Sequence, residues 1–107
     1  MASFIPWYGK NRSRLAEREG EFLEVLRGAP GETRLAEAVA AIRAAHVRAL
    51  KEKRQKFAPS ERNAAILDEI ERAIRWWMEL PNDAIVEGYR DPKRRRKMSS
   101  PVRRAAD

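Results

Sequence analysis

The sequence predicts a small all-α protein with one three-helix domain, built on an antiparallel hairpin of its second and third helices. Apolar residues recur at helical spacing through most of residues 11–81. Alanine, the best helix former, is frequent in the middle of the chain, and only Ala58 and Pro59 separate the second predicted helix from the third. We therefore expect an irregular aromatic N-terminal arm (1–10), a helical domain (11–81) and a basic C-terminal tail (82–107).

The N-terminal arm concentrates large apolar side chains in a short segment, namely Phe4, Ile5, Trp7 and Tyr8. A chain terminus normally frays unless such groups dock somewhere. Two interpretations stay open. The arm folds back over an open end of the helical core, or Trp7 and Tyr8 contact a partner subunit.

The first helix is predicted over residues 11–27, with Gly28 ending it. Gly20 weakens its middle by about 0.5–1 kcal/mol relative to alanine. Thr33 is expected to cap the helix that follows. The apolar face of the first helix consists of Leu15, Phe22, Val25 and Leu26.

The second helix is predicted over residues 34–57, and its alanines permit close approach of a neighbouring helix. The short connection after it predicts an antiparallel partner. Its apolar face consists of Leu35, Ala38, Val39, Ile42, Ala45, His46, Ala49 and Leu50. The expected register places Leu50 near Leu67, His46 near Ile70 and Ile74, and Ile42 and Val39 near Trp77 and Met78.

The third helix is predicted over residues 60–80, with Ser60 as its cap and Pro81 after its end. Trp77 points into the middle of the apolar stripe, which predicts a core position. Trp76 lies about 100° further round the helix, where it either forms the rim of the core or contacts a partner. The stripe consists of Ile66, Ile70, Ala73, Ile74 and Trp77, with Leu67, Met78 and Leu80 at its margins.

The residue types that enzymes and metal sites need are scarce in this chain. There is no cysteine and a single histidine, His46, whose place on an apolar face predicts a core residue hydrogen-bonded to a neighbour. No glycine-rich phosphate loop, nucleophile motif or Glu-x-x-His pair occurs. We therefore expect no catalytic residues, no metal site and no cofactor.

The net charge of +7 is unevenly distributed. The third predicted helix is acidic, whereas the end of the second is basic, with Lys51, Lys53, Arg54 and Lys56. Two interpretations stay open for these four bases. They form a solvated helix end that is partly paired, with Arg48 and Lys51 near Glu69, or they contact phosphates.

The tail begins with a short apolar run, Ala84 to Val86, followed by Tyr89. Periodicity over so few residues does not decide between a helical turn and an extended strip across the hairpin. The remainder has too little apolar surface to order itself alone. Its bases are Lys93, Arg94, Arg95, Arg96, Lys97, Arg103 and Arg104.

These features favour a binding protein over an enzyme. The leading hypothesis is a small subunit of a nucleoprotein assembly. It would contact phosphates of RNA or single strands through the tail, with Lys51, Lys53, Arg54 and Lys56 as a second patch. The alternative is a helical adaptor that binds a protein partner through Trp7, Tyr8 and Trp76. No apolar run resembles a signal peptide or membrane span, so we expect a cytoplasmic protein and no membrane attachment.

Overall fold

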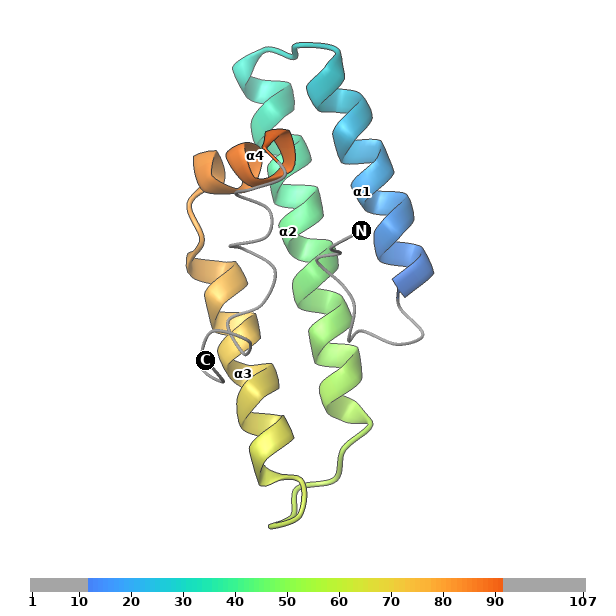
Figure 1. Ribbon diagram of the computed structural model, residues 1–107, viewed down its shortest axis with the longest axis vertical. Coiled ribbons are helices and arrows are strands. Elements are labelled where there is room, and N and C mark those ends of the chain that lie inside the picture. The colour runs from blue at the N-terminus through green and yellow to red at the C-terminus, as the bar shows by residue number, and fades with distance from the viewer. Residues whose placement is uncertain (1–11, 92–107) are drawn as a thin grey trace.

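The computed structural model describes residues 12–91, which form four α-helices and no strand (Figure 1). The helices are α1 (Arg12–Arg27), α2 (Glu32–Gln55), α3 (Ala64–Glu79) and α4 (Asn82–Arg90). The all-α class is confirmed, with one helix more than the sequence predicted. The arm (1–10) and the tail beyond residue 91 lie outside the described residues.

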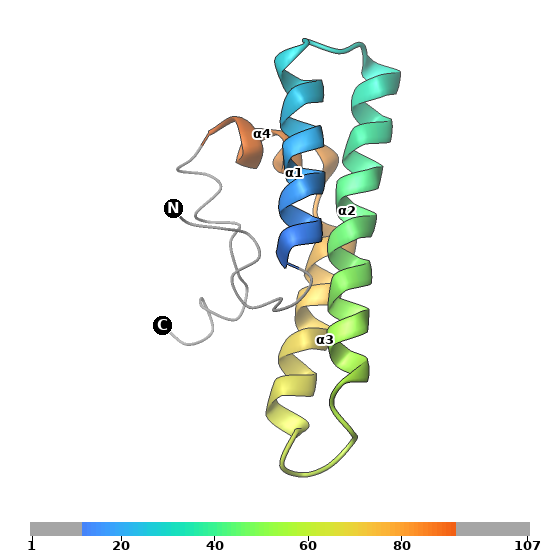
Figure 2. The same cartoon turned by 90° about the vertical axis from the view of Figure 1, so that its right-hand side faces the viewer.

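The central helix is α2, against which each of the other three packs. In Figure 1, α1 and α3 run antiparallel to α2 on its two sides, and α4 runs across them (Figures 1 and 2). Although α2 has 24 residues, none of the helices in the described part of the chain is long and apolar enough to cross a membrane.

The core receives side chains from all four helices. Trp77 is only 2% exposed, which confirms its predicted core position, whereas Met78, predicted at the margin of the same stripe, is 62% exposed. Burial of this apolar surface is the main stabilising contribution to the fold. The buried apolar residues are Leu15, Phe22, Val39, Ile42, Ala49, Leu50, Ile70, Ala73, Ile74, Trp77, Ile85, Val86 and Tyr89.

The segment that the sequence left undecided after Pro81 forms α4. The backbone amides of Ala84 and Ile85 donate to the carbonyl of Pro81 at 3.1 and 3.2 Å, which closes the first turn. The buried residues Ile85, Val86 and Tyr89 then follow helical spacing and face the core. The helical body therefore extends to Arg90, nine residues beyond the predicted boundary at 81.

The turn between α1 and α2 begins at Gly28, as predicted. The amide of Gly28 donates to the carbonyls of Glu24 and Val25, and Ala29 then adopts a left-handed conformation with φ of 49°. The prediction that Thr33 caps the next helix is wrong. Gly31 occupies the N-cap with extended backbone, so α2 begins one residue before Thr33.

The connection from α2 to α3 is longer than the two residues predicted. Instead of capping α3 directly, Ser60 starts a turn in which its hydroxyl accepts a hydrogen bond from the Asn63 amide at 3.1 Å. The Asn63 side chain donates to the carbonyl of Ala58 at 2.8 Å and closes the loop. The helix therefore begins at Ala64.

This longer connection changes the packing register of α2 and α3. The rings of His46 and Trp77 stack with centroids 3.9 Å apart and planes 11° apart, whereas the predicted register put Ile42 beside Trp77. The difference of four residues is about one helical turn. It arises because α3 begins beyond the end of α2, at the bottom of Figure 1.

Arg43 connects α2 to the corner between α3 and α4. Its Nη1 donates to the carbonyl of Trp77, and its Nη2 donates to Oδ1 of Asn82 at 2.6 Å. The Trp77 carbonyl belongs to the last turn of α3, where carbonyls lack an intrahelical partner. Arg43 thus satisfies a helix end and holds the start of α4 against the body.

Replacing Trp77 by alanine should lower the free energy of unfolding by roughly 3–5 kcal/mol, because the change opens a core cavity and removes the stack on His46. Urea unfolding followed by circular dichroism measures the change. The neighbouring Met78→Ala variant is the control and should stay within about 0.5 kcal/mol of the parent, since Met78 is exposed. Equal unfolding midpoints for the Trp77 variant and the parent would contradict this packing.

Candidate functional site

The four bases of the basic patch predicted at the end of α2 have different surroundings in the structure. Arg54 forms an ion pair with Glu71 of α3, while Lys51 and Lys56 are exposed. Arg48 was predicted near Glu69 but pairs with Glu52 of its own helix at 3.5 Å, and the base close to Glu69 is Lys53. The four bases therefore do not form one uniform cationic surface.

Lys53 is half-buried, as is Arg54. Its pKa lies below the ordinary lysine value, first because burial disfavours the charged ammonium and second because Lys56 is close. The nearby carboxylate of Glu69 opposes this shift. Lys53 thus faces the acidic helix α3, as Arg54 does, and Lys51 and Lys56 are the bases of the patch most open to a polyanion.

Most residues of the predicted phosphate-binding and partner-binding sets lie outside residues 12–91. These are Trp7 and Tyr8 in the arm and the seven tail bases from Lys93 to Arg104. The charge balance of the two parts can still be counted. Residues 12–91 contain 15 Lys and Arg against 15 Asp and Glu, a net charge of zero. The whole net charge of +7 belongs to residues 1–11 and 92–107, which contain eight bases and one acid.

Trp76 lies on α3 at the edge of the core, half-buried. Its ring meets that of Trp77 edge to face, with centroids 5.2 Å apart. One side of the indole is therefore occupied by the core, and the rest of the ring is partly open. The role of Trp76 in binding a partner stays a prediction.

A buried polar network connects α2, α4 and α1. Nε2 of His46 lies 3.3 Å from the Tyr89 hydroxyl oxygen, and that hydroxyl donates to Oε2 of Glu19 at 2.6 Å. Because the single proton of Tyr89 goes to Glu19, its oxygen accepts from His46, which assigns the proton of the neutral imidazole to Nε2. The edge of the Tyr89 ring also packs against Phe22, with centroids 5.0 Å apart.

This network is structural in character. His46 has no exposed surface, and burial lowers its pKa from 6.5 to about 3, so the imidazole is neutral near pH 7. A general base has to reach substrate, which a fully enclosed ring does not. The predicted core position of His46, with a neighbour as hydrogen-bond partner, is confirmed. Within residues 12–91 there is also no group of three or more His, Cys, Asp or Glu side chains placed to hold a metal ion.

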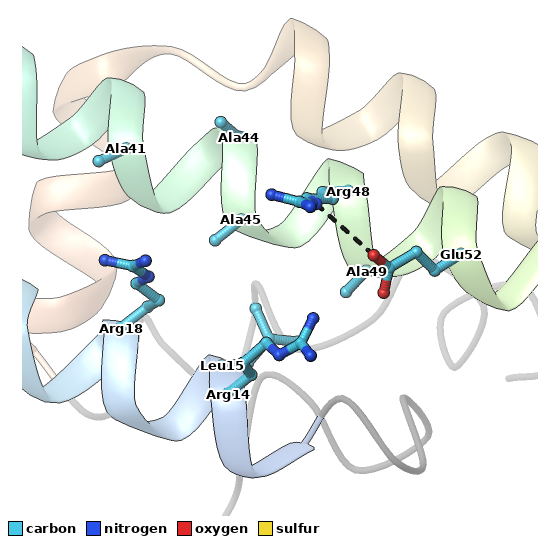
Figure 3. Close-up of a pocket in the computed structure, with 9 residues that line it drawn as sticks. All are labelled: Arg14, Leu15, Arg18, Ala41, Ala44, Ala45, Arg48, Ala49 and Glu52. Atoms are coloured by element: carbon cyan, nitrogen blue, oxygen red, sulfur yellow. Dashed lines mark ion pairs between the residues drawn. The ribbon is translucent and has the colours of Figure 1, made fainter.

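An open recess of about 340 Å³ lies between α1 and α2 (Figure 3). Alanines of α2 form its floor, and arginines of both helices stand at its rim. Two further recesses of about 120 and 590 Å³ continue it toward the α1–α2 turn, since each shares two lining residues with the one before. Together we call these three recesses the α1/α2 groove. The lining residues of its first part are Arg14, Leu15, Arg18, Ala41, Ala44, Ala45, Arg48, Ala49 and Glu52.

Sequence reasoning did not find the α1/α2 groove, although its parts were visible. Arg14 and Arg18 are four residues apart, which puts them on one side of a helix. The alanine content of the second helix had indicated close approach of a neighbour. Only the packing of α1 on α2 shows that Arg48 lies across from these arginines and that the alanines between them stay uncovered by the described helices.

Stability should fall as the solution is acidified through the window set by His46. Its folded pKa of about 3 lies below the unfolded value of 6.5, so between these values the unfolded chain binds a proton that the folded chain does not. The stabilisation is thus present above pH 6.5 and is lost toward pH 3. The expected loss from this group between pH 7 and pH 5 is about 2 kcal/mol.

Urea unfolding of the parent and of a His46→Gln variant at several pH values checks this expectation. The variant keeps a polar side chain toward Tyr89 but has no imidazole, so its stability should depend less on pH by the stated amount. It should also be less stable at pH 7, because the stack on Trp77 is lost. Parallel pH dependences for the two proteins would show that His46 is not buried in the neutral form.

Comparisons with protein-family models, with curated proteins and with solved structures found no match for this chain.

Proposed function

We propose that this protein binds RNA or single-stranded nucleic acid through phosphate contacts of its basic C-terminal segment, as a small subunit of a nucleoprotein assembly. The observation that carries the proposal is the separation of charge. The helical body is electrically neutral, and the net charge of +7 lies in the segments that flank it. The bases proposed to contact phosphates are Lys93, Arg94, Arg95, Arg96, Lys97, Arg103 and Arg104.

Phosphate neutralisation by lysine and arginine releases condensed counterions and dominates non-specific affinity for nucleic acids. A neutral body neither repels a polyanion nor attracts it over its whole surface. Arginine, which makes up five of the seven bases in this segment, can offer two donors to one phosphate. The segment is therefore proposed to supply most of the affinity.

The helical body gives this segment a fixed origin. Tyr89, in the last turn of α4, is buried and bonded to Glu19 of α1. The backbone amide of Asp91 still bonds to the carbonyl of Glu87 at 2.9 Å. Two residues thus separate the run of bases that starts at Lys93 from a helix that is anchored in the core.

Lys51 and Lys56 are proposed as a secondary contact, since both are exposed at the end of α2. Lys53 and Arg54 should contribute less because each faces a glutamate of α3. Exposed ion pairs are worth only about 0.2–1 kcal/mol, so a phosphate can compete for Arg54. The four bases are ranked by whether a glutamate of α3 lies close to them, which the sequence pattern of neighbouring bases did not show.

The alternative is a helical adaptor that binds a protein partner through Trp7, Tyr8 and Trp76. The observation that favours it is Trp76, a large aromatic side chain that is only half-buried at the edge of the core. Large aromatic side chains are typical anchors of protein interfaces. This alternative requires Trp76 to be covered by another chain, whereas the nucleic-acid proposal does not.

Affinity for a single-stranded RNA oligonucleotide, measured by fluorescence anisotropy over a range of salt concentrations, tests the proposal. Replacing Arg94, Arg95 and Arg96 by glutamine should reduce the slope of log K against log salt by about 2, because three phosphate contacts are lost at roughly 0.7 each. A duplex of the same length is the comparison for strand preference.

The matched control replaces Arg62, Arg72 and Arg75 by glutamine, which removes the same charge from the acidic helix α3 and the loop before it. This control should leave the slope nearly unchanged. Absence of binding by the parent at about 50 mM salt would refute the proposal. Equal slopes for the two triple variants would refute the assignment to the C-terminal segment.

A further inference from the structure

The α1/α2 groove has a floor of small side chains along one side of α2. Ala41 and Ala44 are exposed, and Ala38 and Ala45 are half-buried. Small residues let a helix backbone approach closely, so such a floor suits a helix better than a flexible chain. Within the described part of the chain nothing covers this face, because no helix lies in front of these alanines in the view of Figure 3.

The α1/α2 groove has a basic end and an acidic end. At one end stand three arginines, Arg14, Arg18 and Arg48, with Glu52 as the acid among them. Toward the α1–α2 turn stand Glu21 and Glu24, with Arg34 as the base among them. Glu37 adds to the acidic end, because it is exposed and lies one turn before Ala41 on the same side of α2. Arg27 also stands at the acidic end, where it pairs with Glu24 at 3.3 Å. With Arg27 counted, the basic end has a net charge of +2 and the acidic end a net charge of −1.

A surface with one basic end and one acidic end is complementary to itself when it is turned end for end. We infer that the α1/α2 groove is where a second copy of this chain docks, with the two copies related by a two-fold axis that crosses the middle of the groove. Such an isologous contact repeats every pairing twice. This inference is independent of nucleic-acid binding.

Two directions of the two-fold axis would bring the grooves of two copies face to face, one parallel to the helices and one across them. The charges favour the axis across the helices. An axis parallel to the helices would place the basic end of one copy on the basic end of the other. An axis across the helices places Arg14 near Glu24 of the second copy, Arg18 near its Glu21, and Arg48 near its Glu37. The midpoint of each pair in residue number marks where the axis would cross its helix. The two pairs on α1 give residues 19–20, and the pair on α2 gives residues 42–43. One two-fold axis can therefore relate all three pairs to within about one helical turn.

In the proposed dimer, ion pairs between the two copies would replace weak ion pairs within each chain. Arg18 and Glu21 form an exposed pair within the chain at 3.0 Å, and Arg48 and Glu52 form another at 3.5 Å. Exposed pairs of this kind contribute little to stability. In the dimer each of these four side chains would lie in an interface. Contact between the two alanine floors would exclude water there, and the attraction between opposite charges would then be stronger than on an exposed surface.

Sedimentation equilibrium of the full chain tests the inference and should give the mass of a dimer that dissociates on dilution. Arg14→Glu and Glu24→Arg each place like charges opposite one another twice, so each should weaken dimerisation roughly tenfold or more. An equimolar mixture of the two variants should regain the dimer, because both cross-axis contacts then pair a glutamate with an arginine. This rescue is specific to the antiparallel two-fold arrangement.

Ala44→Trp is a second variant, which should block close approach of the two copies while leaving the fold intact, since Ala44 is exposed. Arg75→Glu on α3 and Trp76→Ala are controls and should leave the dimer unchanged. Circular dichroism confirms that each variant is folded. A parent chain that is monomeric at every concentration would overturn the inference. So would a mixture of the Arg14 and Glu24 variants that stays monomeric, or a dimer lost on Trp76→Ala and kept on Ala44→Trp.

Discussion

The contacts of one buried polar side chain, His46, bring together all four helices. Its ring stacks on Trp77 of α3, its Nε2 bonds the hydroxyl of Tyr89 on α4, and that hydroxyl bonds Glu19 on α1. Apolar side chains could pack in several registers at similar cost, but a buried imidazole must keep its hydrogen-bond partner. The hydrogen bond of His46 to Tyr89 therefore favours one position of α4 along α2, and the stack on Trp77 favours one position of α3.

This network and Arg43 explain why a segment as short as α4 is ordered. A helix of nine residues is marginal by itself in water. Arg43 holds its start through Asn82, and Tyr89 holds its end in the core. The body therefore ends in a fixed helix directly before the run of bases, which makes this corner of the molecule the origin of the proposed phosphate-binding segment.

The main sites of the two proposals lie in separate parts of the molecule, and only the secondary phosphate contact, Lys51 and Lys56 at the end of α2, lies near the groove. The neutral body would supply the self-complementary groove, and the charged C-terminal segment would contact nucleic acid. If both hold, a dimer would carry two basic segments, and the second phosphate contact would become intramolecular once the first had formed. Since the groove lies between α1 and α2 and the segment follows α4, variants in one part leave the other intact.

By itself, the sequence determined the all-α class, the apolar face that buries Trp77, the core position of His46 and the charge of the C-terminal segment. Each depends on local spacing or composition, which a sequence carries directly. Only the tertiary structure decided the rest. The register of α2 on α3 depends on the turn at Ser60 and on the partners of His46. The segment α4 is helical because the core accepts Ile85 and Tyr89. The groove exists only where α1 leaves alanines of α2 uncovered. These features arise from contacts between residues far apart in the chain, which no local pattern specifies.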